Sequence, residues 1–161
     1  MNHIVTPFKH PAHQHSHCLD SALNKAESGC TRRGLRLTPI RRRVLELVWK
    51  SHEPVKAYEL LEILRREKKG AAPPTVYRAL DFLKEEGFVH RIESLNAYVG
   101  CGEPGHNNTA QFLICHKCGV VAELDDAEIE GLITHKAGSL GFRIKHQTIE
   151  VQGLCTDCSP A

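Results

Sequence analysis

A chain of 161 residues can form one domain or two small ones. Its 41% hydrophobic and 25% charged residues are ordinary for a globular protein, and no apolar run reaches the ~18 residues that a membrane-spanning helix needs. The net charge of +2 hides an asymmetry, because residues 1–100 carry 17 Lys and Arg against 11 Asp and Glu, whereas residues 101–161 carry 4 against 8. A basic first half beside an acidic second half predicts that only the first half binds a polyanion.

The N-terminal segment, residues 1–17, is rich in histidine and proline and has no apolar periodicity. We therefore expect an unstructured His-rich tail without a signal peptide. Weak binding of a transition metal by the His-x-His-x-His run at 13–17 is the alternative. Cys18 and Cys30 have no partner at metal-ligand spacing, so we interpret both as lone thiols.

Four helices are expected between residues 20 and 86, over 20–34, from Thr38 onward, over 56–69 and over 73–86. Thr38 as N-cap and Pro39 at the first helical position favour a helix start, because the threonine side chain accepts from a backbone N–H and proline has no N–H to leave unsatisfied. Gly87 is typical of the left-handed residue that ends a helix.

The fourth helix has two different faces. Val76, Leu80 and Leu83 form its core face, and the side chains that point outward are Thr75, Tyr77, Arg78 and Asp81. After Gly87 the apolar period changes to two, which predicts a short β-hairpin from about residue 88 to residue 99. Helices followed by a hairpin on a basic segment indicate a winged helix-turn-helix, whose fourth helix would enter the DNA major groove.

The second half predicts a small α/β unit. We expect strands over 111–115, 120–124 and 142–151, and a helix over 126–140 in which Ile129, Leu132 and Ile133 pack. The fold class is α+β, with a winged helix-turn-helix domain over 18–99, a hinge over 100–109 and a dimerisation and metal-binding domain over 110–161. So small a core usually needs a metal or an oligomer to hold it.

Two CxxC pairs, Cys115 with Cys118 and Cys155 with Cys158, predict one tetrahedral Cys₄ zinc site. Four thiolates leave Zn²⁺ no open position, so this site would be structural rather than catalytic. Free thiols or a disulfide pair are the alternative. Cysteines at CxxC spacing in a chain without an export signal indicate reduced, metal-binding thiols in the cytoplasm.

These motifs resemble the Fur family of dimeric, metal-responsive bacterial repressors. The resemblance is carried by Leu37–Arg41 (LTPIR), Pro74–Leu80 (PTVYRAL), Gly87–Val89 (GFV) and the two CxxC pairs, in the family's order, and it extends from about residue 20 to residue 158. It implies a homodimer that binds double-stranded operator DNA in the cytoplasm, without a membrane.

Within the family the motifs resemble the zinc uptake regulators (the Zur branch). Iron and peroxide sensors usually carry His-His-x-His shortly before the first CxxC, where this chain has a single histidine. The regulatory zinc ligands that the resemblance implies are His90, Cys101, His106 and Glu123. His106 lies nine residues before Cys115, farther than is usual in the family, so the match assumes a short insertion or deletion. Two Zn²⁺ ions are expected per chain.

The DNA contacts are expected from the basic half. Arg78 is the candidate for reading a base, because arginine pairs bidentately with guanine in the major groove. Tyr77 and Thr75 are expected to hydrogen-bond phosphate or to stack, and Tyr58 is expected to contact a thymine methyl group or phosphate. Arg41 and Arg42 are expected to add phosphate affinity that does not depend on sequence. Core packing is the alternative for Tyr77, and a solvated basic patch is the alternative for the arginines.

The predicted function is a zinc-responsive repressor that binds operator DNA when zinc is replete and controls zinc-uptake genes. An iron, peroxide or nickel sensor of the same family is the alternative. A zinc hydrolase using His90, His106 and Glu123 is a weaker hypothesis, since no His-Glu-x-x-His motif occurs. A zinc-ribbon interaction module would not explain the basic winged half. We therefore expect a regulator and not an enzyme.

Overall fold

The computed structural model describes residues 3–8, 14–50, 52–67, 71–104 and 109–160, and it forms two compact units that are described separately. The helical unit is Lys9–Gly105, and the sheet unit combines Met1–Phe8 with His106–Ala161. Within the described residues, none of the helices is long and apolar enough to cross a membrane.

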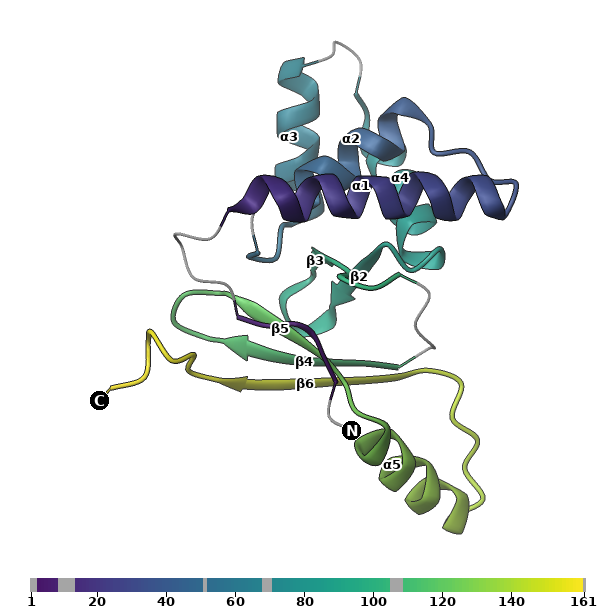
Figure 1. Ribbon diagram of the computed structural model, residues 1–161, viewed down its shortest axis with the longest axis vertical. Coiled ribbons are helices and arrows are strands. Elements are labelled where there is room, and N and C mark those ends of the chain that lie inside the picture. The colour runs from purple at the N-terminus through teal and green to yellow at the C-terminus, as the bar shows by residue number, and fades with distance from the viewer. Residues whose placement is uncertain (1–2, 9–13, 51, 68–70, 105–108, 161) are drawn as a thin grey trace. The chain divides into compact units, whose positions relative to one another are not determined.

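The described residues of the helical unit form four helices and a hairpin (Figure 1). Its elements are α1 (His15–Arg32), α2 (Pro39–Val48), α3 (Ala57–Glu67), α4 (Pro73–Glu85), β2 (Val89–Ile92), the 3₁₀ turn η1 (Glu93–Leu95) and β3 (Ala97–Gly100). β2 and β3 pair antiparallel from Val89↔Gly100 to Ile92↔Ala97. This order confirms the predicted winged helix-turn-helix.

Local sequence explains where these helices begin and end. The Thr38 side chain accepts from the Arg41 N–H at 3.4 Å, and Pro39 follows at the first helical position. Gly87, with φ +76°, supplies the left-handed turn after α4. The helices bury a continuous apolar core, whose fully buried members include Leu45, Leu60, Leu64, Leu80 and Leu83.

In the sheet unit, the part of the chain that the structure describes forms one four-stranded sheet and one helix. Its elements are β1 (His3–Thr6), β4 (Thr109–Cys115), β5 (Val121–Asp125), α5 (Ala127–Ser139) and β6 (Gln147–Gly153). The strand order is β1-β5-β4-β6, with β4 antiparallel to β5 and parallel to β6. The parallel register runs from Thr109↔Gln147 to Cys115↔Gly153, so β4 and β6 end at the same edge of the sheet.

The predicted disordered tail over 1–17 is wrong where the structure describes it. His3–Thr6 form β1, which pairs antiparallel with β5, and His15–His17 belong to α1. An edge strand needs only backbone hydrogen bonds to its neighbour, so β1 leaves no apolar alternation to detect. Residues 9–13, including His13, lie outside the described residues.

Two predictions in the second half are also wrong. Its last strand is Gln147–Gly153 rather than 142–151, and Phe142 is 66% exposed. None of the residues of α5, all of which are described, is buried, and Leu132 is 60% exposed. The chain by itself therefore does not cover the apolar side chains of this helix. The predicted N-cap is confirmed, because Asp126 accepts from the N–H groups of Glu128 and Ile129.

Candidate metal centres and nucleic-acid interface

The two CxxC turns meet at one edge of the sheet unit. Cys115 ends β4 and Cys155 follows β6, so the parallel pairing of these strands brings the turns together. The Cys118 and Cys155 sulfurs lie 3.7 Å apart, and all four ligand atoms lie within 4.8 Å of one another. Tetrahedral Zn²⁺ with Zn–S bonds of ~2.3 Å separates its sulfurs by about 3.8 Å. The geometry therefore fits a four-coordinate zinc ion.

The surroundings of these thiols favour different charge states. Backbone N–H groups of Cys118 and Cys155 lower the pKa of Cys115 to about 5. Burial, with hydrogen bonds to the neighbouring thiols, raises the pKa of Cys158 to about 12. Four thiolates so close together repel one another unless a cation neutralises them, and metal ligation requires the thiolate form. A resident divalent ion resolves this conflict.

Two of the expected regulatory ligands lie together within the helical unit. His90 is on β2, and Cys101 directly follows β3 and is 3% exposed. Their ligand atoms lie within 4.8 Å of each other. The Cys101 N–H donates to the Phe88 carbonyl at 3.0 Å, which continues the β2–β3 pairing. At Gly100, a Cβ would come within 2.1 Å of the Trp49 ring, so only glycine fits beside Cys101.

The other two expected ligands belong to the sheet unit. Glu123 lies in β5, where it pairs with Phe112 of β4, and it is 6% exposed. Such deep burial is rare for a glutamate unless a cation or a hydrogen-bond donor compensates it. His106 lies outside the described residues.

The outward face of α4 is as predicted. Val76, Leu80 and Leu83 are buried, and the predicted outward side chains Thr75, Tyr77, Arg78 and Asp81 are exposed. Tyr77 is 52% exposed, so its alternative role in core packing is wrong. Tyr58, at the start of α3, is 59% exposed. These exposed side chains are available for contact with an extended ligand such as DNA.

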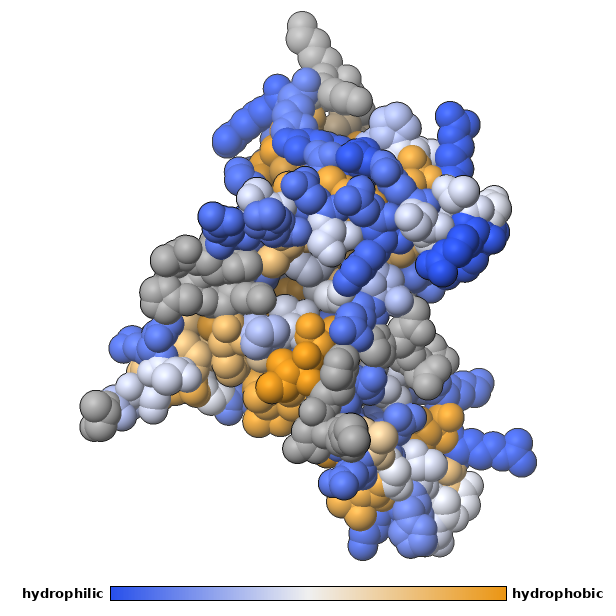
Figure 2. All heavy atoms as spheres, in the orientation of Figure 1, coloured by the Kyte–Doolittle hydropathy of each residue, from blue (hydrophilic) through white to orange (hydrophobic). Residues whose placement is uncertain are grey.

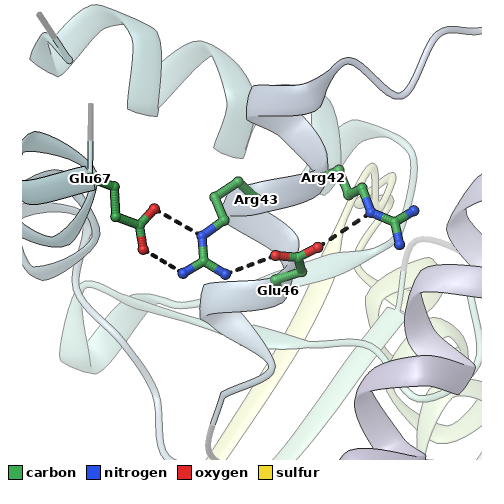
Figure 3. A network of polar contacts seen from close by, with 4 residues as sticks. All are labelled: Arg42, Arg43, Glu46 and Glu67. Atoms are coloured by element: carbon green, nitrogen blue, oxygen red, sulfur yellow. Dashed lines mark hydrogen bonds and ion pairs between the residues drawn. The ribbon is translucent and has the colours of Figure 1, made fainter. Parts of the chain in front are cut away.

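Acidic side chains compensate the arginines in the first half of α2 (Figure 3). Arg43 donates to Glu67 of α3 through Nε at 2.9 Å and to Glu46 through Nη1 at 2.8 Å. Arg42 pairs with Glu46, at 3.3 Å from Nε, and with Glu27 of α1. The Arg41 guanidinium lies 3.6 Å from the centroid of the Phe82 ring. Carboxylates of the same chain thus neutralise part of the positive charge of the arginines that were expected to contact phosphate or solvent.

A third cluster of metal-ligand side chains was missed from the sequence. Cys18 is not a lone thiol, because the ligand atoms of His15, Cys18 and His52 lie within 4.8 Å of one another in the helical unit. His15 and Cys18 are three residues apart, a spacing that places them on one helix face. His52 lies in the segment after α2, and no local pattern indicates that it joins them.

Comparison with known proteins agrees with the fold. Residues 32–152 match the model of the ferric uptake regulator family. The zinc uptake regulation protein of Escherichia coli (strain K12) is 45% identical over 139 residues, which cover 84% of this chain and 80% of that protein.

Two solved structures share the fold. A zinc uptake regulator complexed with zinc and DNA has a TM-score of 0.81 and 42% identity, covering 86% of this chain and 93% of that one. The holo form of the protein named XcZur has a TM-score of 0.79 and 47% identity, covering 86% of this chain and 96% of that one.

Proposed function

The chain belongs to the ferric uptake regulator family, and we propose that it is a zinc-responsive transcriptional repressor that binds operator DNA as a homodimer and controls zinc-uptake genes. The observation that carries the proposal is the 42% identity, over 86% of this chain, to a zinc uptake regulator complexed with zinc and DNA. A family of regulators confirms the prediction that the chain is not an enzyme. A protein that binds operator DNA in a bacterium works in the cytoplasm.

The Cys₄ site is the structural zinc site of this proposal. Cys115, Cys118, Cys155 and Cys158 would hold the ends of β4 and β6 together, and their sulfur spacing suits zinc. When bound, Zn²⁺ neutralises the four thiolates and supplies binding free energy to a sheet unit with a small core. Its complete coordination leaves no open position for catalysis.

The regulatory zinc is proposed to bind His90, Cys101, His106 and Glu123. A thiolate, two imidazoles and a carboxylate form a borderline-soft set of four ligands, which suits Zn²⁺ better than Fe²⁺ or Mn²⁺. The proximity of His90 and Cys101 in the helical unit supports half of this set. The buried carboxylate of Glu123 is consistent with a cation as its partner.

Zinc would regulate DNA binding because its ligands come from both units. His90 and Cys101 come from the helical unit, whereas His106 and Glu123 come from the sheet unit. A metal that binds ligands of both units favours the arrangements in which all four can reach it. In a dimer this would restrict the distance between the two α4 helices, which must match half-sites about one helical turn apart.

DNA is proposed to bind the outward face of α4. Arg78 is the candidate for base reading, and Tyr77, Thr75 and Tyr58 would contact the DNA backbone or bases. Arg41 and Arg42 would add affinity that does not depend on sequence. Phosphates would then compete with Glu27 and Glu46 for the Arg42 guanidinium.

The homodimer is proposed to form through the sheet unit. Of the ten exposed large apolar side chains in the described residues, seven lie in this unit: Ile4, Ile129, Leu132, Leu140, Phe142, Val151 and Leu154. Figure 2 shows apolar side chains among the polar ones on the surface of this unit. β6 is an edge strand of the sheet. Exposed apolar side chains beside an open strand edge are typical of a surface that a second copy covers.

The test of zinc regulation is operator binding measured against buffered free zinc. We expect affinity to rise with zinc in the wild-type chain and to stay at its metal-free level in Cys101→Ser. Cys30→Ala, which alters a buried thiol of the same unit outside the proposed set, should respond as the wild type does. Flat binding across the wild-type titration, or a full zinc response in Cys101→Ser, would refute zinc regulation at this site. Repeating the titration with Fe²⁺ and Ni²⁺ separates the alternative sensors.

The test of base reading is Arg78→Ala. We expect it to lose ~1–3 kcal/mol of discrimination between operator and mutated operator for each base contact removed. Arg66→Ala removes an exposed arginine of α3 and makes the same change in charge. It should weaken binding to all sequences equally or not at all. Unchanged discrimination in Arg78→Ala would remove this residue from base reading.

A further inference from the structure

We propose that His15, Cys18 and His52 form an additional zinc-binding site within the helical unit. It shares no residue with the Cys₄ site or with the proposed regulatory set, so it does not depend on the proposed function. His15 and Cys18 lie in the first turn of α1, and His52 lies between α2 and α3. The ligand atoms of the three side chains lie within 4.8 Å of one another, and all three side chains are half-buried.

The nitrogens of the two imidazoles lie close to the separation that a zinc ion requires. His15 Nδ1 and His52 Nε2 are 3.1 Å apart, and the ring centroids are 4.5 Å apart with nearly perpendicular planes. Two nitrogens bound to tetrahedral Zn²⁺ at 2.0–2.1 Å lie about 3.3 Å from each other. A small outward movement of either ring would place an ion between them.

A backbone contact fixes the tautomer of His15 that such an ion needs. The second ring nitrogen of His15, Nε2, contacts the carbonyl oxygen of Trp49. A carbonyl can only accept a hydrogen bond, so Nε2 carries the proton and Nδ1 directs its lone pair toward His52. Metal-binding histidines commonly donate their other N–H to a carbonyl or a carboxylate, which orients the ring and increases its basicity.

Both elements that supply the ligands are anchored to the core of the unit. Cys18 and Leu19 pack against the core, and Ala22 and Leu23 on the next turn are buried. On the other side, Val55 lies three residues after His52. It exchanges backbone hydrogen bonds with Tyr98 at 2.9 and 2.8 Å. The ligands are therefore held near one another before a metal arrives, which lowers the entropic cost of binding it.

The ligand set favours zinc and leaves one position open. Two neutral imidazoles and one thiolate give a three-ligand set like that of zinc sites whose fourth ligand is water. Such a site exchanges its ion more readily than a closed Cys₄ site. Bound zinc would tie the first turn of α1 to the segment that precedes α3. Zinc supply would thus control how firmly the start of α1 is held to the DNA-binding unit.

The first test compares zinc content in full-length chains equilibrated with buffered zinc. We expect the wild type to bind one zinc more per chain than Cys18→Ser or His52→Gln, or to bind that ion more tightly, because each variant lacks one of the three protein ligands. His17→Gln is the matched control, because His17 is an exposed histidine of the same helical turn outside the cluster. Equal content and affinity in all four chains would overturn the proposal. The test compares the zinc content of the wild type with that of each variant, so its result does not depend on whether zinc binds the proposed regulatory site.

The second test needs no variant that could fail to fold. Alkylation of Cys18 by iodoacetamide is followed by peptide mass in the wild-type chain, with and without zinc. We expect zinc to slow this reaction at least about tenfold, because metal ligation occupies the thiolate that reacts. The protection should persist in His17→Gln and in Cys101→Ser, and it should be lost in His52→Gln. A Cys18 alkylation rate that zinc does not change, or protection that survives in His52→Gln, would overturn the proposal.

Discussion

The helical unit and the sheet unit are stabilised in different ways. Helices α1 to α4 surround a continuous apolar core, in which Val44, Leu45, Leu60 and Leu80 are fully buried. The sheet unit buries only a few large apolar side chains, such as Phe112 and Ile114, and leaves seven exposed. Its buried residues also include Gln111, Glu123 and Gln147, which are polar.

This difference shows that hydrophobic burial within one chain accounts for one unit and not for the other. Burying apolar surface contributes ~25 cal/mol per Å², so a unit of 64 residues with few large buried apolar side chains gains only marginal stability from burial. We therefore expect a metal and a second copy to contribute much of the stability of the sheet unit. Substitutions in each unit test whether the two units are stabilised in these different ways.

The largest effect is expected for Cys155→Ser. Serine removes one of four zinc ligands, and the loss of a structural zinc commonly unfolds a small unit outright. We expect hydrogen exchange of the β4 and β6 amides to lose its protection while α4 amides stay protected. Metal analysis should show the loss of the Cys₄ zinc. Retained protection in β4 and β6 would show that the sheet unit is stable without its metal.

Leu80→Ala is the corresponding change in the helical unit. Leu80 is fully buried, so the cavity should cost ~2–5 kcal/mol in the free energy of unfolding. Trp49, the single tryptophan of the chain, lies in this unit and reports its unfolding by fluorescence in a urea titration. The Cys₄ zinc should remain bound. A loss of zinc in Leu80→Ala would contradict the independence of the two units.

Leu132→Glu tests the contribution of the second copy. Leu132 is 60% exposed, so the substitution should change folding of the isolated chain by less than ~0.5 kcal/mol. If α5 lies in the dimer interface, burying a charge there should weaken dimerisation by ~2 kcal/mol or more. Sedimentation velocity measures the change. Thr134→Glu places the same charge on an exposed threonine of this helix. Equal dimer affinity in the wild type and in Leu132→Glu would remove this face of α5 from the interface.

The smallest effects are expected for the helix caps, which compare the two units directly. Thr38 caps α2 and Asp126 caps α5 through the same kind of contact with backbone N–H groups. Replacing either residue with alanine should cost ~1 kcal/mol. Hydrogen exchange should show the Thr38→Ala effect in the helical unit alone and the Asp126→Ala effect in the sheet unit alone. Effects that spread to both units would show that they unfold together.

Local patterns were sufficient for most of the helical unit and for the Cys₄ ligands. Thr38 and Pro39 begin α2 as predicted, and Gly87 follows the end of α4 as predicted. Each of these features depends on contacts within a few residues, which the sequence shows directly. The two CxxC pairs can be recognised in the sequence equally well, because their spacing is typical of two cysteines that bind one ion.

Two predictions that required knowledge of distant partners were wrong. The strand His3–Thr6 forms because β5 offers a free edge 115 or more residues along the chain, and its sequence has no alternation. The apolar residues of α5 follow a helical pattern, but periodicity does not tell whether the chain itself or a second copy covers them. The position of Leu132 shows that the chain itself does not.

The sequence by itself determined the winged helix-turn-helix and the family, and it predicted the four cysteine ligands, because capping, periodicity and CxxC spacing are local properties. The tertiary structure decided which distant side chains meet. It brought His52 to His15 and Cys18, showed Glu27, Glu46 and Glu67 beside the arginines of α2, and left α5 exposed. Contacts between residues far apart in the chain depend on how whole elements pack, and no spacing along the sequence encodes that packing.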